Sequence, residues 1–140
     1  MTLQLYGHPF AAFVWKPLIA AYERNVPFTF RMVDADHADN SNRMTQLSPT
    51  GQFPALVDGD RILTQSNAVI EYLDRVGGAP PVIPADADAA LTSRILADVF
   101  DSYVAGPMQQ IVGEALRPKS MRIGCTRFPM VRSKPIALAC

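Results

Sequence analysis

Two pairs of neighbouring residues, Phe53-Pro54 and Gln65-Ser66, have the chemistry needed to hold a small peptide. An extended peptide can pair with the backbone of Phe53 only if that strand edge stays open. Pro54 helps to keep it open because proline has no N–H to continue a ladder, and an X-Pro bond adopts cis at modest cost in a tight turn. A ligand carboxylate suits the free N–H groups and the positive end of a helix beginning at Ser66.

The segment that must position both pairs runs from Ser48 to Asp74. Two short apolar strands, Ala55–Val57 and Arg61–Leu63, flank the hairpin signal Asp58-Gly59-Asp60. After Gln65-Ser66, apolar residues recur at helical spacing. The segment therefore predicts a turn, a β-hairpin and a helix in that order.

The residues before this segment predict a β-α-β unit. Leu3–Tyr6 is a short apolar run, Ala11–Arg24 has helical spacing, and Phe28–Val33 alternates bulky residues as a strand does. Two strands joined by a helix imply parallel pairing. Asp34–Leu47 is polar and irregular, and we expect at most a short helix there. The order βαβαββα predicts an α/β domain over residues 1–78.

A second, helical part follows the linker signal Gly77–Pro81. Asp86 or Asp88 can cap a helix whose wide apolar stripe faces either the first domain or a partner subunit. Gly106-Pro107 interrupts this helix, so residues 85–117 predict the start of an all-helical domain. Residues 118–140 are basic and rich in proline, which fits an irregular or disordered tail, a basic arm, or a truncation by frameshift or premature stop.

Composition excludes several classes of function. The chain of 140 residues has 49% apolar and 19% charged residues and a formal net charge of zero, which predicts no nucleic-acid or membrane partner. No signal peptide or membrane-length apolar run is evident, so we expect a cytoplasmic protein. Cys125 and Cys140 form no C-x-x-C motif, which argues against redox chemistry.

The quoted segment resembles the glutathione site of bacterial-type glutathione S-transferases. Those proteins carry Gly-x-Val-Pro-x-Leu, a Glu-Ser or Gln-Ser pair, and an Ala-Ile-x-x-Tyr-Leu helix. Here these read Gly51–Leu56, Gln65-Ser66 and Ala68–Leu73. The resemblance implies a thioredoxin-like N-terminal domain, an incomplete all-helical domain, glutathione as co-substrate, a small electrophile, a homodimer and no metal. An ordinary hairpin-helix unit with an apolar core is the alternative interpretation.

The resemblance also implies roles for single residues. Phe53 would pair its backbone with the cysteinyl part of glutathione, next to a cis bond to Pro54. Gln65 and Ser66 would take the γ-glutamyl end, and Gln52 would lie near the glycyl end. The alternatives are a plain N-cap for Ser66 and a solvated turn for Gln65. Asp98 or Asp101 would reach across toward the ligand's amino group.

Activation of the thiol is where the chain departs from the family. The family pattern places a serine where this sequence has Ala11, and Ala12 beside it has no hydroxyl either. His8 and Tyr6 are candidate substitutes, although strand alternation favours Tyr6 as a core residue. Backbone N–H groups at the helix start near Ala11 are a third possibility. The sequence thus leaves open a transferase, a glutathione-binding or partner-binding module without catalysis, and a truncated member with little activity.

Overall fold

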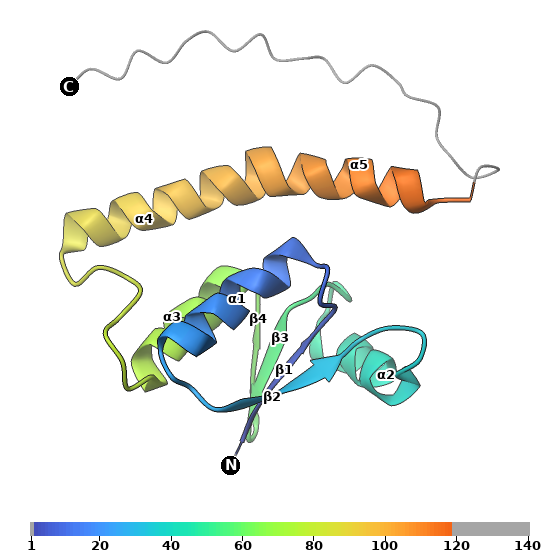
Figure 1. Ribbon diagram of the computed structural model, residues 1–140, viewed down its shortest axis with the longest axis horizontal. Helices are drawn as coiled ribbons and strands as arrows, with labels where there is room; N and C mark the ends of the chain where they lie inside the picture. Colours follow the sequence, from blue (N-terminus) through green and yellow to red (C-terminus); the bar gives the residue numbers. More distant parts are fainter. Residues whose placement is uncertain (1, 119–140) are drawn as a thin grey trace, which may run out of the picture.

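A four-stranded mixed sheet is the centre of the fold, and the computed structural model describes residues 2–118 (Figure 1). The spatial order is β2-β1-β3-β4, with β1 parallel to β2 and antiparallel to β3. The bounds are Leu3–Gly7 (β1), Phe28–Met32 (β2), Ala55–Asp58 (β3) and Arg61–Thr64 (β4). The expected thioredoxin-like order βαβαββα and the parallel first pair are confirmed.

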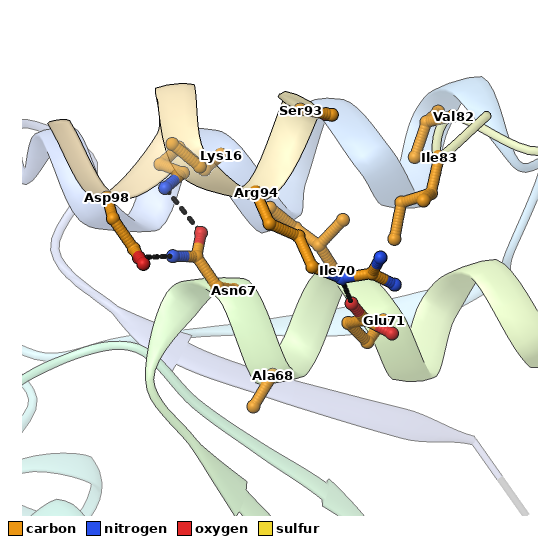
Figure 2. Close-up of a pocket in the computed structure, with 11 residues that line it drawn as sticks. Lys16, Asn67, Ala68, Ile70, Glu71, Val82, Ile83, Ser93, Arg94 and Asp98 are labelled. Carbon is orange, nitrogen blue, oxygen red and sulfur yellow. Dashed lines mark hydrogen bonds and ion pairs between the residues drawn. The ribbon is translucent and has the colours of Figure 1, made fainter. Parts of the chain in front are cut away.

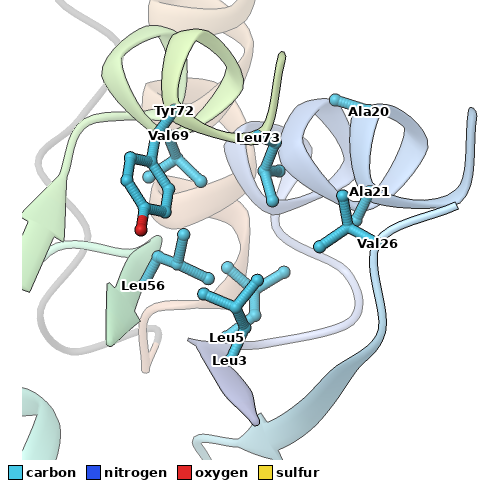
Figure 3. Close-up of a cluster of buried hydrophobic side chains, with 9 residues drawn as sticks. All are labelled: Leu3, Leu5, Ala20, Ala21, Val26, Leu56, Val69, Tyr72 and Leu73. Carbon is cyan, nitrogen blue, oxygen red and sulfur yellow. The ribbon is translucent and has the colours of Figure 1, made fainter. Parts of the chain in front are cut away.

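The main core lies between one face of the sheet and two helices that lie side by side, α1 (Ala12–Glu23) and α3 (Ser66–Val76). Side chains alternate across a strand, so Leu5 in β1 and its partner Leu56 in β3 face these helices. Figure 3 shows them packed against residues of both helices, Ala20, Ala21, Val69, Tyr72 and Leu73. This packing fixes the start of α3 relative to the β3–β4 hairpin.

The opposite face is covered by α2 (Ala38–Leu47), a helix of ten residues. The sequence allowed at most a short helix within Asp34–Leu47, and the helix takes up the last ten residues of that segment. Met44 and Leu47 are buried against Tyr6 and Ala55, and this apolar contact stabilises a helix whose sequence is otherwise polar. The Asn40 side chain also donates to the Met32 carbonyl oxygen at 2.8 Å, which ties α2 to the end of β2.

The turn from β1 into α1 depends on a close approach at Gly7. A Cβ atom at Gly7 would lie 2.6 Å from Val14 Cγ2, a distance that real Cβ atoms do not reach. The missing side chain therefore lets α1 pack directly over the end of β1. This contact places the first residues of α1 beside the turn that precedes β3.

The α4 helix (Ala87–Phe100), a π-helical segment η1 (Asp101–Ala105) and α5 (Gly106–Leu116) form one long rod (Figure 1). The Asp86 carboxylate accepts a hydrogen bond from the Ala89 N–H at 2.9 Å, which confirms the expected cap. The expected interruption at Gly106-Pro107 is present as the boundary between η1 and α5, and the chain stays helical through it. Pro107 has no N–H to donate, and the rod continues because the Gly106 N–H instead donates to the Asp101 carbonyl, five residues back.

The apolar stripe of this rod does not pack on the sheet domain. Its large apolar side chains are exposed, from Val99 at 43% to Leu116 at 80%. Of the two alternatives for this stripe, packing against the first domain does not hold, and a partner subunit stays a prediction. The expected tail, residues 118–140, lies outside the described residues from 119 onward. Between residues 2 and 118, no helix is long and apolar enough to cross a membrane.

Candidate functional site

A cleft of about 310 Å³ opens between the sheet domain and the rod, and we call it the polar cleft. The five residues that the sequence predicted to bind glutathione all line it: Gln52, Phe53, Pro54, Gln65 and Ser66. Sequence reasoning missed Phe13, Asn67 and Ser102, which complete the lining together with Asp98 and Asp101. Of these three, Asn67 directly follows Ser66 in the first turn of α3, and this position was the only sequence signal that could have pointed to a place in the cleft.

One wall of the polar cleft is an open stretch of backbone before β3. The Phe53–Pro54 bond is cis, as the sequence predicted. Within residues 2–118, neither the N–H nor the carbonyl oxygen of Phe53 has a hydrogen-bond partner. Gly51 has φ +67°, a backbone conformation that glycine adopts without steric cost. The wall can therefore accept an extended peptide as an added strand.

A second wall is the start of α3. Gln65 occupies the N-cap position with φ +71° and ψ 123°, a conformation that costs a non-glycine residue on the order of 1–3 kcal/mol. Ser66 is 5% exposed, and its hydroxyl has no hydrogen-bond partner in the described part of the chain. The first N–H groups of a helix lack acceptors within the helix and carry its positive end. This wall can therefore bind a carboxylate.

The third wall comes from the rod, where Asp98 and Asp101 bring two carboxylates into the polar cleft. The sequence suggested that one of them reaches across toward a ligand's amino group, and in the structure both line the cleft of their own chain. Asp101 is paired with Lys16, with Oδ2 and Nζ 2.7 Å apart. The Asn67 side-chain amide donates to Asp101 at 3.2 Å and lies 3.5 Å from Asp98.

Ala11 lies in a neighbouring cleft of about 260 Å³, which we call the Ala11 cleft. Its lining is Ala11, Phe13, Gly51, Gln52, Phe53 and Gln109, so it shares three residues with the polar cleft. Ala11 is the N-cap of α1 and makes no side-chain cap. The N–H groups of Ala12 and Phe13 have no partner between residues 2 and 118. These N–H groups are the donors nearest to the position that the sequence predicted for thiol activation.

The two substitute candidates lie outside both clefts. Tyr6 is 7% exposed, packs in the core against α2, and donates its hydroxyl hydrogen to Gln4 Oε1 at 3.2 Å. His8 is partly exposed, and its Nδ1 accepts a hydrogen bond from the Phe10 N–H at 3.2 Å. Neither residue lines the polar cleft or the Ala11 cleft.

The shifted ionisable groups lie away from the polar cleft, in contacts that hold the fold. The Tyr72 hydroxyl of α3 donates to the Asp58 carboxylate of the β3–β4 hairpin, and this bond raises the pKa of Tyr72. On the α2 side, the hydrogen bond to His37 lowers the pKa of Asp34. No group of three or more metal-ligating side chains is present among residues 2–118.

The chain is similar to known proteins in both sequence and structure. The model of the glutathione S-transferase N-terminal domain matches residues 5–102. The stringent starvation protein A homolog of Coxiella burnetii is 32% identical over 94 residues, which are 67% of this chain and 44% of that protein. The chain spans 49%, 44% and 38% of three curated relatives that it matches, about half or less of their length.

Solved structures show the same fold. The crystal structure of the beta-etherase LigF from Sphingobium sp. strain SYK-6 is 30% identical, with a TM-score of 0.71 over 86% of this chain and 50% of that one. A theta class glutathione S-transferase from Xanthomonas axonopodis pv. citri, solved with glutathione bound, is 27% identical. Its TM-score is 0.70, over 86% of this chain and 59% of that one.

Proposed function

Because the chain belongs to the glutathione S-transferase family, we propose that it binds glutathione in the polar cleft. One observation carries the proposal: the five residues that the sequence singled out converge on one cleft from two separate segments. An open backbone wall and a helix N-terminus both line this cleft, and these suit the peptide and carboxylate groups of glutathione. The structural neighbour with glutathione bound supports this proposal.

Each wall suits one part of the tripeptide. The free N–H and carbonyl of Phe53 would pair with the cysteinyl backbone. Ser66 and the first N–H groups of α3 would bind the γ-glutamyl carboxylate, with Gln65 beside them. Asp98 would take the γ-glutamyl ammonium, and Gln52 would lie near the glycyl end.

We further propose that the bound thiol is transferred to a small electrophile in the Ala11 cleft. The thiol loses its proton to solvent, the thiolate sulfur forms a bond to the electrophilic carbon, and the leaving group departs with its electron pair. The free N–H groups of Ala12 and Phe13 would stabilise the thiolate in place of a side-chain hydroxyl. Lacking that hydroxyl, the chain should turn over slowly.

A glutathione-binding module without catalysis is the second candidate. The observation that favours it is the pair Ala11 and Ala12, which puts no side-chain donor where the family pattern has a serine. Both candidates use the same polar cleft and differ only in turnover.

We also propose a homodimer and a division into a thioredoxin-like domain, residues 1–78, and a helical part, residues 85–117. The exposed apolar stripe of α4 and α5 supports association, because a large uncovered apolar surface favours burial against a partner.

Titration calorimetry on the purified chain tests glutathione binding. We expect saturable binding of glutathione and at least about tenfold weaker binding of cysteinylglycine, which lacks the γ-glutamyl group. Ser66→Ala should weaken binding by about tenfold, while Ser41→Ala, outside both clefts, serves as the matched control. Equal affinity for both peptides would contradict the proposed orientation. An activated aryl chloride then separates the transferase from the module, since only the transferase forms the thioether.

A further inference from the structure

Lys16 of α1 is the one cation among the described residues whose ammonium group contacts both the start of α3 and the rod. Its Nζ lies 2.6 Å from Asn67 Oδ1 and 2.7 and 2.9 Å from the two Asp101 oxygens. Figure 2 shows the Lys16 and Asn67 side chains meeting between the helices, with Asn67 also directed at Asp98. Three elements are therefore joined at a single ammonium group.

The two partners of Lys16 sit at positions that matter to the polar cleft. Asn67 follows Ser66 in the first turn of α3, so holding Asn67 restricts the wall proposed to bind the carboxylate. Asp101 is the first residue of the π-helical segment. Its backbone carbonyl oxygen accepts the hydrogen bond from the Gly106 N–H through which the rod continues into α5. π-Helical segments are rare and often lie at functional sites. Lys16 also neutralises Asp101, one of the two carboxylates beside the wall proposed to bind the γ-glutamyl carboxylate of glutathione.

Among the residues of α4, η1 and α5, Ala90 is the only buried one. The apolar stripe of the rod is exposed, and polar contacts join η1 to α1 and α4 to α3. A second such contact joins Arg94 of α4 to Glu71 of α3, with Nε and Oε1 2.7 Å apart (Figure 2). The Arg94 side chain is 50% exposed, whereas that of Lys16 is 27% exposed. Arg94 lines the groove between α3 and α4 but not the polar cleft.

We propose that Lys16 is a positioning residue of the glutathione site, which fixes the first turn of α3 and the start of the π-helical segment on either side of the ligand. The proposal rests on the proposed glutathione binding. Lys16 acts through Asn67 and Asp101 and does not line the polar cleft itself. Arg94 is a second link across the same helices that lacks this role, which provides a matched comparison.

Calorimetry with glutathione on Lys16→Met, Lys16→Arg and Arg94→Met tests the proposal. Loss of a charged hydrogen-bonding group should raise the Kd of Lys16→Met by about tenfold or more. Lys16→Arg keeps the charge and can donate to both partners, so its Kd should stay within about threefold of the original. Arg94→Met should change the Kd by less than about twofold.

Amide hydrogen exchange without ligand separates this proposal from the proposed function. Peptides covering residues 65–73 should exchange faster in Lys16→Met than in Arg94→Met, whether or not the chain binds glutathione. If the original chain does not bind glutathione, the proposed function fails and the exchange measurement still judges the positioning of α3. Equal exchange in the two variants, equal losses of affinity, or a Lys16→Arg variant as weak as Lys16→Met would each overturn the role of Lys16.

Discussion

Arg24 and Asp74 form a buried ion pair in which Nε lies 3.1 Å from Oδ1, with side chains 6% and 11% exposed. The same guanidinium donates to the carbonyl oxygens of Asp74 and Gly77, both at 2.8 Å. The Asp74 carboxylate in turn accepts from the N–H groups of Val82 and Ile83. The pair therefore joins the ends of α1 and α3 to the linker that leads to the rod.

Replacing Arg24 by Met should destabilise the chain strongly. The substitution leaves a buried carboxylate without its cation, a loss of roughly 3 kcal/mol or more in the free energy of unfolding. Urea denaturation followed by circular dichroism measures this. The exposed Arg75→Met at the end of α3 is the control and should change stability by less than about 0.5 kcal/mol. A loss in Arg24→Met as small as in that control would show that the pair does not hold the linker.

Two substitutions at Gln65 separate backbone strain from ligand binding. Glycine adopts φ +71° freely while alanine does not, so Gln65→Gly should be more stable than Gln65→Ala by about 1 kcal/mol. Both variants lose the side chain and should bind glutathione more weakly than the original chain. Denaturation and calorimetry on the same samples give the two values. An alanine variant more stable than the glycine variant would contradict the strained N-cap.

Ala11→Ser should raise both stability and turnover. A serine at this N-cap can accept a backbone N–H bond, worth about 1 kcal/mol, and its hydroxyl can still donate to a thiolate. A fall of one unit in the thiol pKa would raise the thiolate fraction, and hence the conjugation rate, by about tenfold at neutral pH.

The control for this gain is Ala12→Ser, one position into the helix. Conjugation rates and thermal unfolding of both variants decide the matter. If Ala11→Ser gains stability without turnover, the cap is correct but the thiol does not lie beside Ala11. Equal rates for both variants would contradict the correspondence with the family serine.

Alkaline titration should report the bond between Tyr72 and Asp58. The carboxylate raises the pKa of Tyr72 above its ordinary value of 10.0, so folding favours the protonated phenol. The resulting stability is fully present below pH 10.0 and is lost as pH rises through the folded pKa. Tyrosinate absorbance, with Tyr72→Phe to assign the signal, should show a lower pKa in Asp58→Asn. An unchanged pKa in that variant would rule out the bond.

Much of the sheet domain could be predicted because its local signals agree with its packing. The alternation of Leu5 and Tyr6 in β1 sends these residues to opposite faces, and helical spacing after Ser66 marks α3. Phe53-Pro54 and Gln65-Ser66 could be singled out because each pair carries its chemistry within two adjacent residues. Their convergence on one cleft follows from the hairpin between them.

The remaining features depend on contacts between distant segments. The polar sequence of α2 gives little sign of a helix, whose stability comes from Met44 and Leu47 against the sheet. Gly106-Pro107 predicted an interruption, but the π-helical segment just before this pair, which keeps the rod continuous, cannot be read from composition. Lys16 pairs with Asp101 across 85 positions, so no local pattern could indicate it.

The most direct measurement of the central claim is a two-dimensional ¹⁵N–¹H NMR titration of the chain with glutathione. Saturable shifts should be largest at the amides of Phe53, Ser66 and Asn67, which line the polar cleft, and small at His37 and Asn40 on the α2 side. Such a pattern would establish glutathione in the polar cleft. No shifts at millimolar glutathione, or shifts centred on α2, would contradict the account.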